Sequence, residues 1–134
     1  MSNAYLFAQS VVHSDLSLWS EWQVVPYGGE YDKGTSARIQ HVDGREIIID
    51  METWGRRSNA ASTNIDGNYP RHFDGSTWSK DNKPEIGVNP SRPAEDISKA
   101  IAKRFLPTYT EFYELAVKET EERKRLHDEA VARL

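Results

Sequence analysis

The feature that most restricts the fold is a pair of alternating apolar and polar runs that meet at an Asp-Gly dipeptide within residues 36–51. This pattern is typical of two antiparallel strands joined by a tight turn. A two-residue loop would scatter the apolar side chains over both faces of the hairpin. A three-residue loop at residues 42–44, with Gly44 in a left-handed bulge, collects them on one face, and we therefore expect this loop. The collected residues are Ala37, Ile39, Ile47, Ile49 and Met51.

Two helices are predicted after residue 90. The first should begin at Pro93, a residue suited to the first helical turn, and end at Leu106, because Pro107 is expected to break it. Thr108 as N-cap, with Glu111 three residues later, forms a capping box that would start the second helix. The buried stripe of the first helix would contain Ile97, Ala100, Ile101 and Phe105. The second helix would bury Tyr109, Phe112, Leu115 and Ala116.

The second helix should continue into solvent. It carries three acid–base pairs at four-residue spacing with the acid on the N-terminal side, the favourable order. These pairs are Glu114/Lys118, Glu119/Arg123 and Glu121/Arg125. Beyond them an apolar stripe recurs at helical spacing, formed by Leu126, Ala130 and Leu134. The stripe has no obvious partner within the chain, so we expect either that a second chain covers it, as in a homodimer, or that it frays.

The rest of the chain predicts strands and one long loop. Residues 16–19 and 22–25 have the β-branched and aromatic content of strands, and residues 85–88 form a last strand. Residues 55–82 are rich in Gly, Ser, Asn, Asp and Pro, which indicates a long loop with at most one hairpin, at 72–78.

The predicted fold class is therefore α+β in a single domain of residues 1–134. An antiparallel sheet of about four to six strands would form from residues 1–90 and pack against the two helices of residues 91–134. The last helix would project from the domain.

Short motifs in the last third of the chain carry a resemblance. They are Ile86-Gly87-Val88-Asn89, Arg92-Pro93, Asp96-Ile97 and Arg104-Phe105-Leu106-Pro107. In these motifs the chain resembles uncharacterised small proteins of tailed-phage and mobile-element genomes, which are similar in having a β-rich front, an isolated strand and a Pro-broken helical pair. The resemblance implies a phage-like origin. It implies no activity and no catalytic residue, because the motifs are structural.

Several classes of protein are excluded by what the sequence lacks. Without any Cys, the chain can hold no disulfide, thiolate zinc site or Cys nucleophile. It contains no GxSxG, P-loop or GxGxxG motif, and none of its four His stands in a metal-ligand pattern, so we expect no cofactor. No stretch reaches the apolar length of a membrane span, and the N-terminus lacks the layout of a secretion signal. We therefore expect a cytoplasmic protein, located in the host cell if a phage encodes it.

Basic and aromatic side chains interleave in the middle of the chain, where basic residues are in excess. Rings that stack on bases and cations that meet phosphates are typical of a single-strand nucleic-acid platform. The candidate binding residues are Trp54, Arg56, Arg57, Arg71, His72, Trp78, Lys99 and Lys103. A simpler interpretation places the tryptophans in the core or a lid and leaves the cations to solvate a loop. It is favoured because the rings are few and the net charge is -4.

A small metal-dependent hydrolase is a third hypothesis. His72 and Asp74 could supply ligands or an acid–base pair, next to a carboxylate cluster on the hairpin. The acids of that cluster would be Asp43, Glu46, Asp50 and Glu52. A solvent-facing His72 in a turn, and acids on the solvated face of a strand, are the favoured interpretations. His41 is expected to be hydrogen-bonded and partly buried.

The leading prediction is a non-enzymatic interaction protein, because every catalytic pattern is absent while two interaction features are present. It would bind a host or phage macromolecule, and so modulate or inhibit it, through residues 55–82 and the last helix. Nucleic-acid binding and metal-dependent hydrolysis are the alternatives.

Overall fold

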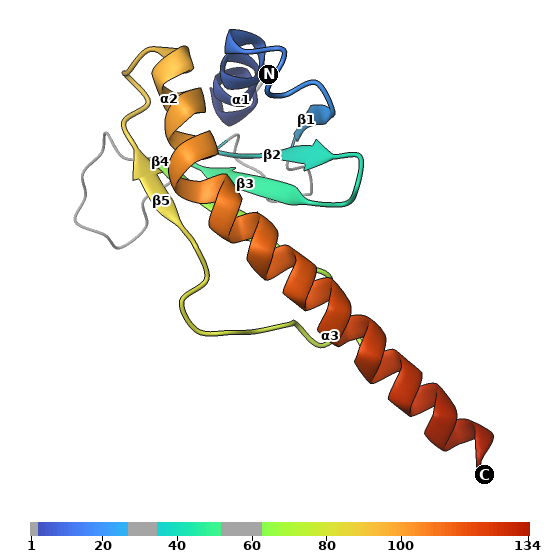
Figure 1. Ribbon diagram of the computed structural model, residues 1–134. Coiled ribbons are helices and arrows are strands. Elements are labelled where there is room, and N and C mark those ends of the chain that lie inside the picture. Colours follow the sequence, from blue (N-terminus) through green and yellow to red (C-terminus); the bar gives the residue numbers. More distant parts are fainter. Residues whose placement is uncertain (1–2, 27–34, 52–62) are drawn as a thin grey trace.

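A computed structural model describes residues 3–26, 35–51 and 63–134. Five antiparallel strands form one sheet in chain order: β1 (Trp22–Pro26), β2 (Ser36–His41), β3 (Glu46–Asp50), β4 (Thr63–Asn68) and β5 (Ile86–Val88). The helices are α1 (Asn3–Ser14), α2 (Ala94–Ala100), the π-helical η1 (Ile101–Phe105) and α3 (Leu106–Ala132). The α+β fold, with its antiparallel sheet and projecting last helix, is confirmed (Figure 1).

The helices pack against one face of the sheet. Helix α1 contacts β1 and β2 and lies beside α2, while η1 contacts β5 (Figure 1). Trp19, in the turn after α1, is buried and donates its indole N–H to Ser98 Oγ on α2 at 2.7 Å. The expected common interior of hairpin and first C-terminal helix is present, because Ile97, Ile101 and Phe105 belong to the same core cluster as the hairpin side chains.

The hairpin has the three-residue loop that the sequence predicts. The His41 amide donates to the Arg45 carbonyl oxygen at 2.8 Å, which leaves residues 42–44 as the loop. Gly44 has a φ of 105°, in the left-handed region that favours glycine. The fully buried side chains on the core face are Ala37, Ile39, Ile47 and Ile49, and half-buried Met51 packs against them.

Helix α1 was not predicted from the sequence. Its buried face consists of Ala4, Ala8, Val11 and Val12, at the spacing of a helix. Two of these four side chains are single methyl groups, so the apolar periodicity is weak in the sequence. The small side chains nevertheless suit a helix that packs closely against its neighbours.

The predicted break at Pro107 and the predicted cap at Thr108 are both wrong. The helical path continues from α2 through η1 into α3, and Pro107 occupies the first turn of α3, where no side chain caps the helix. Proline lacks the amide hydrogen that would bond to residue 103, and its ring crowds that carbonyl group. The wider π-helical turn directly before it accommodates this defect without ending the helix.

Residues 55–82 are not one long loop, because β4 lies within them and pairs with both β3 and β5. Only Ile65 in β4 is a large apolar residue, so the alternation that identifies a strand was too sparse to recognise. The predicted hairpin is present as a short turn, with an antiparallel bridge between Arg71 and Thr77. Three predicted binding residues lie outside the described residues: Trp54, Arg56 and Arg57.

Tyr109 fixes the root of α3 on the sheet. Its buried hydroxyl accepts the Glu46 amide hydrogen at 2.8 Å and lies 2.7 Å from the Asn68 carbonyl oxygen, to which it donates. Its ring stacks on Phe105 with the centroids 5.2 Å apart. The ring also fills the space above Gly67, where a Cβ would stand 2.3 Å from Tyr109 Cε1. Burial raises the pKa of Tyr109, so the hydroxyl remains a donor.

We predict that Gly67→Ala lowers the free energy of unfolding by about 1–3 kcal/mol, because the added methyl group overlaps the Tyr109 ring. Urea unfolding of Gly67→Ala, Tyr109→Ala and the double variant would measure the effect as a coupling energy. In the Tyr109→Ala background the Gly67 substitution should lose most of its effect. If Gly67→Ala destabilised both backgrounds equally, the close packing of the Tyr109 ring over Gly67 would be contradicted.

Candidate interaction surface

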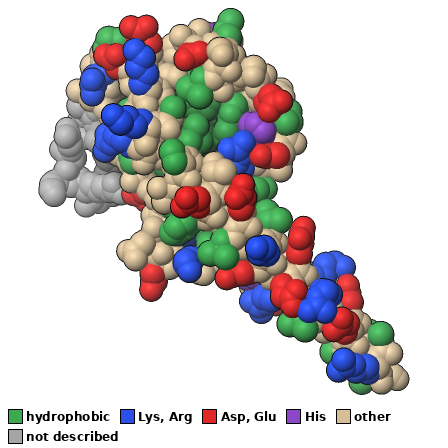
Figure 2. Space-filling model, in the orientation of Figure 1, with side chains coloured by type: hydrophobic (Ala, Val, Ile, Leu, Met, Phe, Trp, Pro, Cys, Tyr) green, Lys and Arg blue, Asp and Glu red, His purple; other side chains and the backbone are tan. Residues whose placement is uncertain are grey.

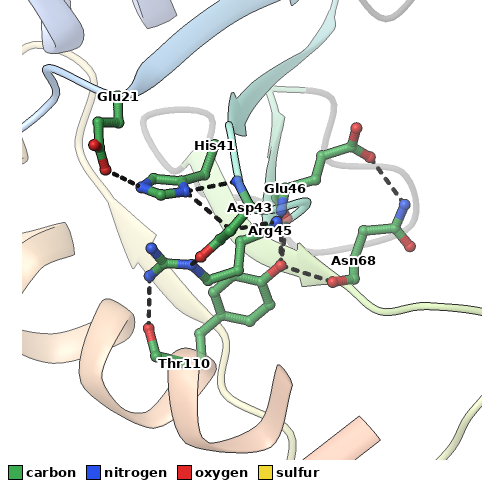
Figure 3. Close-up of polar contacts among 8 residues, drawn as sticks. Glu21, His41, Asp43, Arg45, Glu46, Asn68 and Thr110 are labelled. Carbon is green, nitrogen blue, oxygen red and sulfur yellow. Dashed lines mark hydrogen bonds and ion pairs between the residues drawn. The ribbon is translucent and has the colours of Figure 1, made fainter. Parts of the chain in front are cut away.

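A cluster of polar side chains surrounds the hairpin loop (Figure 3). The His41 ring lies between two carboxylates, with Nε2 3.2 Å from Glu21 Oε2 and Nδ1 2.9 Å from Asp43 Oδ1. Arg45 Nε lies 2.9 Å from Asp43 Oδ2, and its Nη1 donates to Thr110 Oγ1 on α3 at 3.0 Å. His41 is thus hydrogen-bonded and partly buried, as predicted. Each side chain of the cluster is engaged within the protein, which makes its role structural.

Electrostatics agree with this role for the hairpin loop. Burial raises the pKa of Asp43, but bonds from the Arg45 amide and guanidinium and the charge of His41 outweigh it, so the pKa lies below its ordinary value. The Arg45 guanidinium also stands over the Trp22 ring, 5.1 Å from its centroid. The hairpin loop is therefore connected to β1 through Trp22, to the turn before β1 through Glu21, and to α3 through Thr110.

The prediction that Glu46 lies on a solvated face is wrong, because the residue is buried, with an exposed fraction of 8%. Its carboxylate accepts hydrogen bonds from Gln40 Nε2 at 2.6 Å and Asn68 Nδ2 at 2.9 Å (Figure 3 shows the second). Arg38 Nη1 lies 3.5 Å away. These partners stand on the neighbouring strands β2 and β4, so they became neighbours of Glu46 only when the sheet formed.

A concavity lies between the 71–79 turn and α3. It has a volume of about 830 Å³. We call it the α3 groove, and its lining residues are His72, Thr77, Trp78, Ser79, Lys118, Glu119, Glu122 and Arg123. Figure 1 shows the chain between β4 and β5 running beside the middle of α3. Two of the predicted binding residues, His72 and Trp78, therefore line one groove.

Three contacts hold the 71–79 turn against α3. Trp78 is buried and donates its indole N–H to Glu119 Oε2 at 2.6 Å. His72 Nδ1 lies 3.4 Å from the Thr120 hydroxyl, and the Phe73 ring packs on His127 with the centroids 4.4 Å apart. The prediction of a solvent-facing His72 is wrong, since it is only 8% exposed. It faces inward because helix α3 covers the turn.

Apart from the packing of Phe73 on His127, the last part of α3 projects from the domain (Figure 1). Every residue from 121 to 134 is exposed, including Leu126 at 52%, Val131 at 52% and Leu134. Figure 2 shows acidic and basic side chains interspersed along this part of the helix, with apolar ones between them. Leu126 and Ala130 follow Glu122 at four-residue spacing, so they continue the side of the helix that lines the α3 groove.

The ion pairs on α3 differ from the predicted ones. Arg125 pairs with Glu122 and, at 2.6 Å, with Glu129, and Lys124 pairs with Asp128 at 3.0 Å. The bond from Arg125 lowers the pKa of Glu122. None of the three predicted pairs (Glu114/Lys118, Glu119/Arg123 and Glu121/Arg125) forms. Glu119 accepts the Trp78 indole N–H and makes no ion pair with Arg123. Neither Lys118 nor Arg123 forms an ion pair among the described residues.

The predicted binding residues fall into two separate groups. Arg71 belongs to the turn that borders the α3 groove, where it donates to the Gly75 carbonyl oxygen and Thr77 Oγ1. Lys99 and Lys103 are exposed on α2 and η1. Lys103 lies fifteen residues before Lys118 along a continuous helical path, a separation of about 20 Å. The structure therefore does not bring these lysines to the groove.

The groove residues of α3 could not have been selected from the sequence. Lys118, Glu119, Glu122 and Arg123 had the spacing of an ordinary solvated helix face. Only the approach of the 71–79 turn distinguishes them from other charged residues of α3.

Metal binding and membrane insertion find no support in the described part of the chain. No three His, Asp or Glu side chains there gather closely enough to hold a metal ion. Asp74 instead accepts bonds from the hydroxyl and amide of Ser76, which lower its pKa, with help from the charge of Arg123. Within residues 3–26, 35–51 and 63–134, no helix has the length and apolar character needed to cross a bilayer.

Comparisons with protein-family models, with curated proteins and with solved structures find no match to this chain. Any statement about its function must therefore come from its own residues.

We predict that Glu119→Ala lowers the free energy of unfolding by about 1–2 kcal/mol, because the buried Trp78 indole loses its acceptor. Urea unfolding would measure the change. The NMR signal of the indole N–H, assigned with Trp78→Phe, should shift and exchange faster with solvent.

Glu121→Ala is the matched control, since Glu121 is an exposed acid of the same helix with no described partner. It should change stability by less than about 0.5 kcal/mol. Equal effects of the two substitutions would show that the Trp78–Glu119 bond does not hold the turn.

Proposed function

We propose that this chain is a non-enzymatic interaction protein that docks on a host or phage macromolecule through one side of α3. The docking surface, called here the α3 surface, comprises the α3 groove and the exposed stripe of Leu126, Ala130 and Leu134. We place this function in the cytoplasm, that of the host cell if a phage encodes the chain, as the resemblance of residues 86–107 implies.

The observation that carries the proposal is the combination of a firmly held helix with uncovered apolar side chains. Tyr109 and the 71–79 turn fix the direction of α3, yet every residue from 121 onward remains exposed, even His127, on which Phe73 packs. A solvated helix gains little from propensity alone, and most helical stability in proteins comes from packing of an apolar face. A partner that covers Leu126 and Ala130 would supply that packing.

Nucleic-acid binding is less well supported. Its platform depended on exposed rings, but Trp78 is 2% exposed and its indole N–H is already bonded. Lys99 and Lys103 remain exposed but lie away from the ring. A metal-dependent hydrolase is not favoured either, because the carboxylate of Glu46 is enclosed by Gln40 and Asn68.

We predict that a photo-crosslinking amino acid placed at Leu126 captures a discrete partner in the cell that encodes the chain. The same amino acid at Leu16, which is 66% exposed in the turn after α1, should capture none. Because both positions are exposed leucines, the comparison tests the location of the surface rather than exposure alone. Gel mobility and mass spectrometry of the adducts would identify the partner.

The identity of the adduct separates the possible partners. Adducts of the chain with itself, with a dimer mass by light scattering that Leu126→Asp abolishes, would make the partner a second copy. Adducts with another macromolecule and a monomeric mass would make it a different molecule. Diffuse labelling of equal strength at Leu16 and Leu126 would refute the proposal.

A further inference from the structure

The exposed stripe at the end of α3 is symmetric about Ala130. Leu126 precedes this alanine by four residues and Leu134 follows it by four, and both leucines are exposed. Each four-residue step rises about 6 Å along a helix and turns about 40° around it, so the three side chains lie within an arc of about 80°. A two-fold axis beside Ala130 would exchange the two leucines. The stripe therefore complements an antiparallel copy of itself.

In such a pair the side chains of the stripe meet in three layers. Leu126 of one copy packs on Leu134 of the other at each end, and the two Ala130 side chains meet in the middle. Because alanine is short, the two helix axes can approach to about 8 Å, the lower end of the usual range. Val131, which is 52% exposed on one flank of the stripe, meets the same residue of the other copy.

The opposite flank of the stripe carries complementary charges. Glu129 lies one residue before Ala130 and Arg133 three residues after it, so the reversed direction brings Glu129 of one copy within about 3 Å, along the axis, of Arg133 of the other. Arg125 serves two carboxylates, Glu122 and Glu129, and so neutralises only one of their charges. Arg133 forms no ion pair among the described residues. The two-fold axis would create the Glu129–Arg133 pair twice.

The 71–79 turn favours the antiparallel arrangement over a parallel one. The turn contacts Glu119, Thr120 and His127, which lie within about 80° of Ala130 around the helix axis and thus on the side of the stripe. In a parallel pair the two turns would stand at the same height between the helices and hold them apart. In the antiparallel pair each turn meets only the end of the other helix, where Phe73, 44% exposed, adds apolar surface.

We propose that the exposed stripe binds a second copy of this chain, antiparallel and centred on Ala130. The contact involves about seven residues a side, fewer than the 20–30 of a standard interface, so the dimer is weak and forms at tens to hundreds of micromolar. This inference rests on the proposed function, because it names the partner of one part of the α3 surface. The α3 groove stays outside the contact, since its residues on α3 all precede Leu126.

Sedimentation equilibrium from about 10 µM to 1 mM tests for the dimer and should show a reversible monomer–dimer equilibrium. Leu126→Asp should raise the dissociation constant roughly tenfold or more, because it places a charge in an apolar layer. Leu16→Asp makes the same change at an exposed leucine in the turn after α1 and should leave the constant within about twofold. A monomer at every concentration, or equal weakening by both substitutions, would overturn the inference.

The chain contains no Cys, so a single introduced thiol tests one contact of the antiparallel pair. Oxidation of Ala130→Cys should link two copies, because facing positions on closely packed helices come within reach of a disulfide. Leu126→Cys should link to Leu134→Cys in a mixture but not to itself, since its two copies are about 12 Å apart along the axis. Ala132→Cys, about 200° around the helix from Ala130, is the matched control and should stay unlinked.

Circular dichroism would verify that the cysteine variants keep their helices. Linking of Leu126→Cys to itself as readily as to Leu134→Cys would overturn the antiparallel pair, and so would equal linking of Ala130→Cys and Ala132→Cys. If the chain stays monomeric while a crosslinker at Leu126 captures a different macromolecule, the inference fails and the proposed function stands. If Leu126 and Leu16 crosslink alike, the proposed function itself has failed.

Discussion

The Tyr109 hydroxyl makes the hydrogen bonds on which the rest of the molecule depends. It joins the first residue of β3 and the last residue of β4 to the first turn of α3, at a point where Gly67 leaves room for the ring. This contact sets the angle at which α3 leaves the sheet. Everything that lies along α3 afterwards, including the groove and the exposed stripe, takes its position from that angle.

Local patterns predicted the parts of the fold that local interactions determine. The loop at residues 42–44 followed from the requirement that Ile39 and Ile47 share a face, and the register agrees. The buried stripe of Ile97, Ile101 and Phe105 followed from helical spacing. Both inferences needed only a short window of sequence, because one buried face is enough to fix a hairpin register or a helix orientation.

The wrong predictions have a common cause, which is a partner that lies far away in the sequence. Pro107 does not end the helix, because η1 widens before it while Tyr109 holds the following turn on the sheet. Strand β4, with one large apolar side chain, forms between β3 and β5. Glu46 is buried because strand pairing brings two amide side chains to it. None of these partners is visible in a local pattern.

The candidate site shows the same dependence on distant contacts at the level of charge. At four-residue spacing, Glu119 would ordinarily pair with Arg123 and leave a neutral helix face. Trp78, forty-one residues away in the chain, instead binds the Glu119 carboxylate. That one hydrogen bond holds the 71–79 turn in place and so forms one wall of the groove. Arg123 makes no ion pair with Glu119, and its charge acts instead on the Asp74 carboxylate of the same turn, so that distant contacts determine both the shape of the groove and the neighbours of its charged residues.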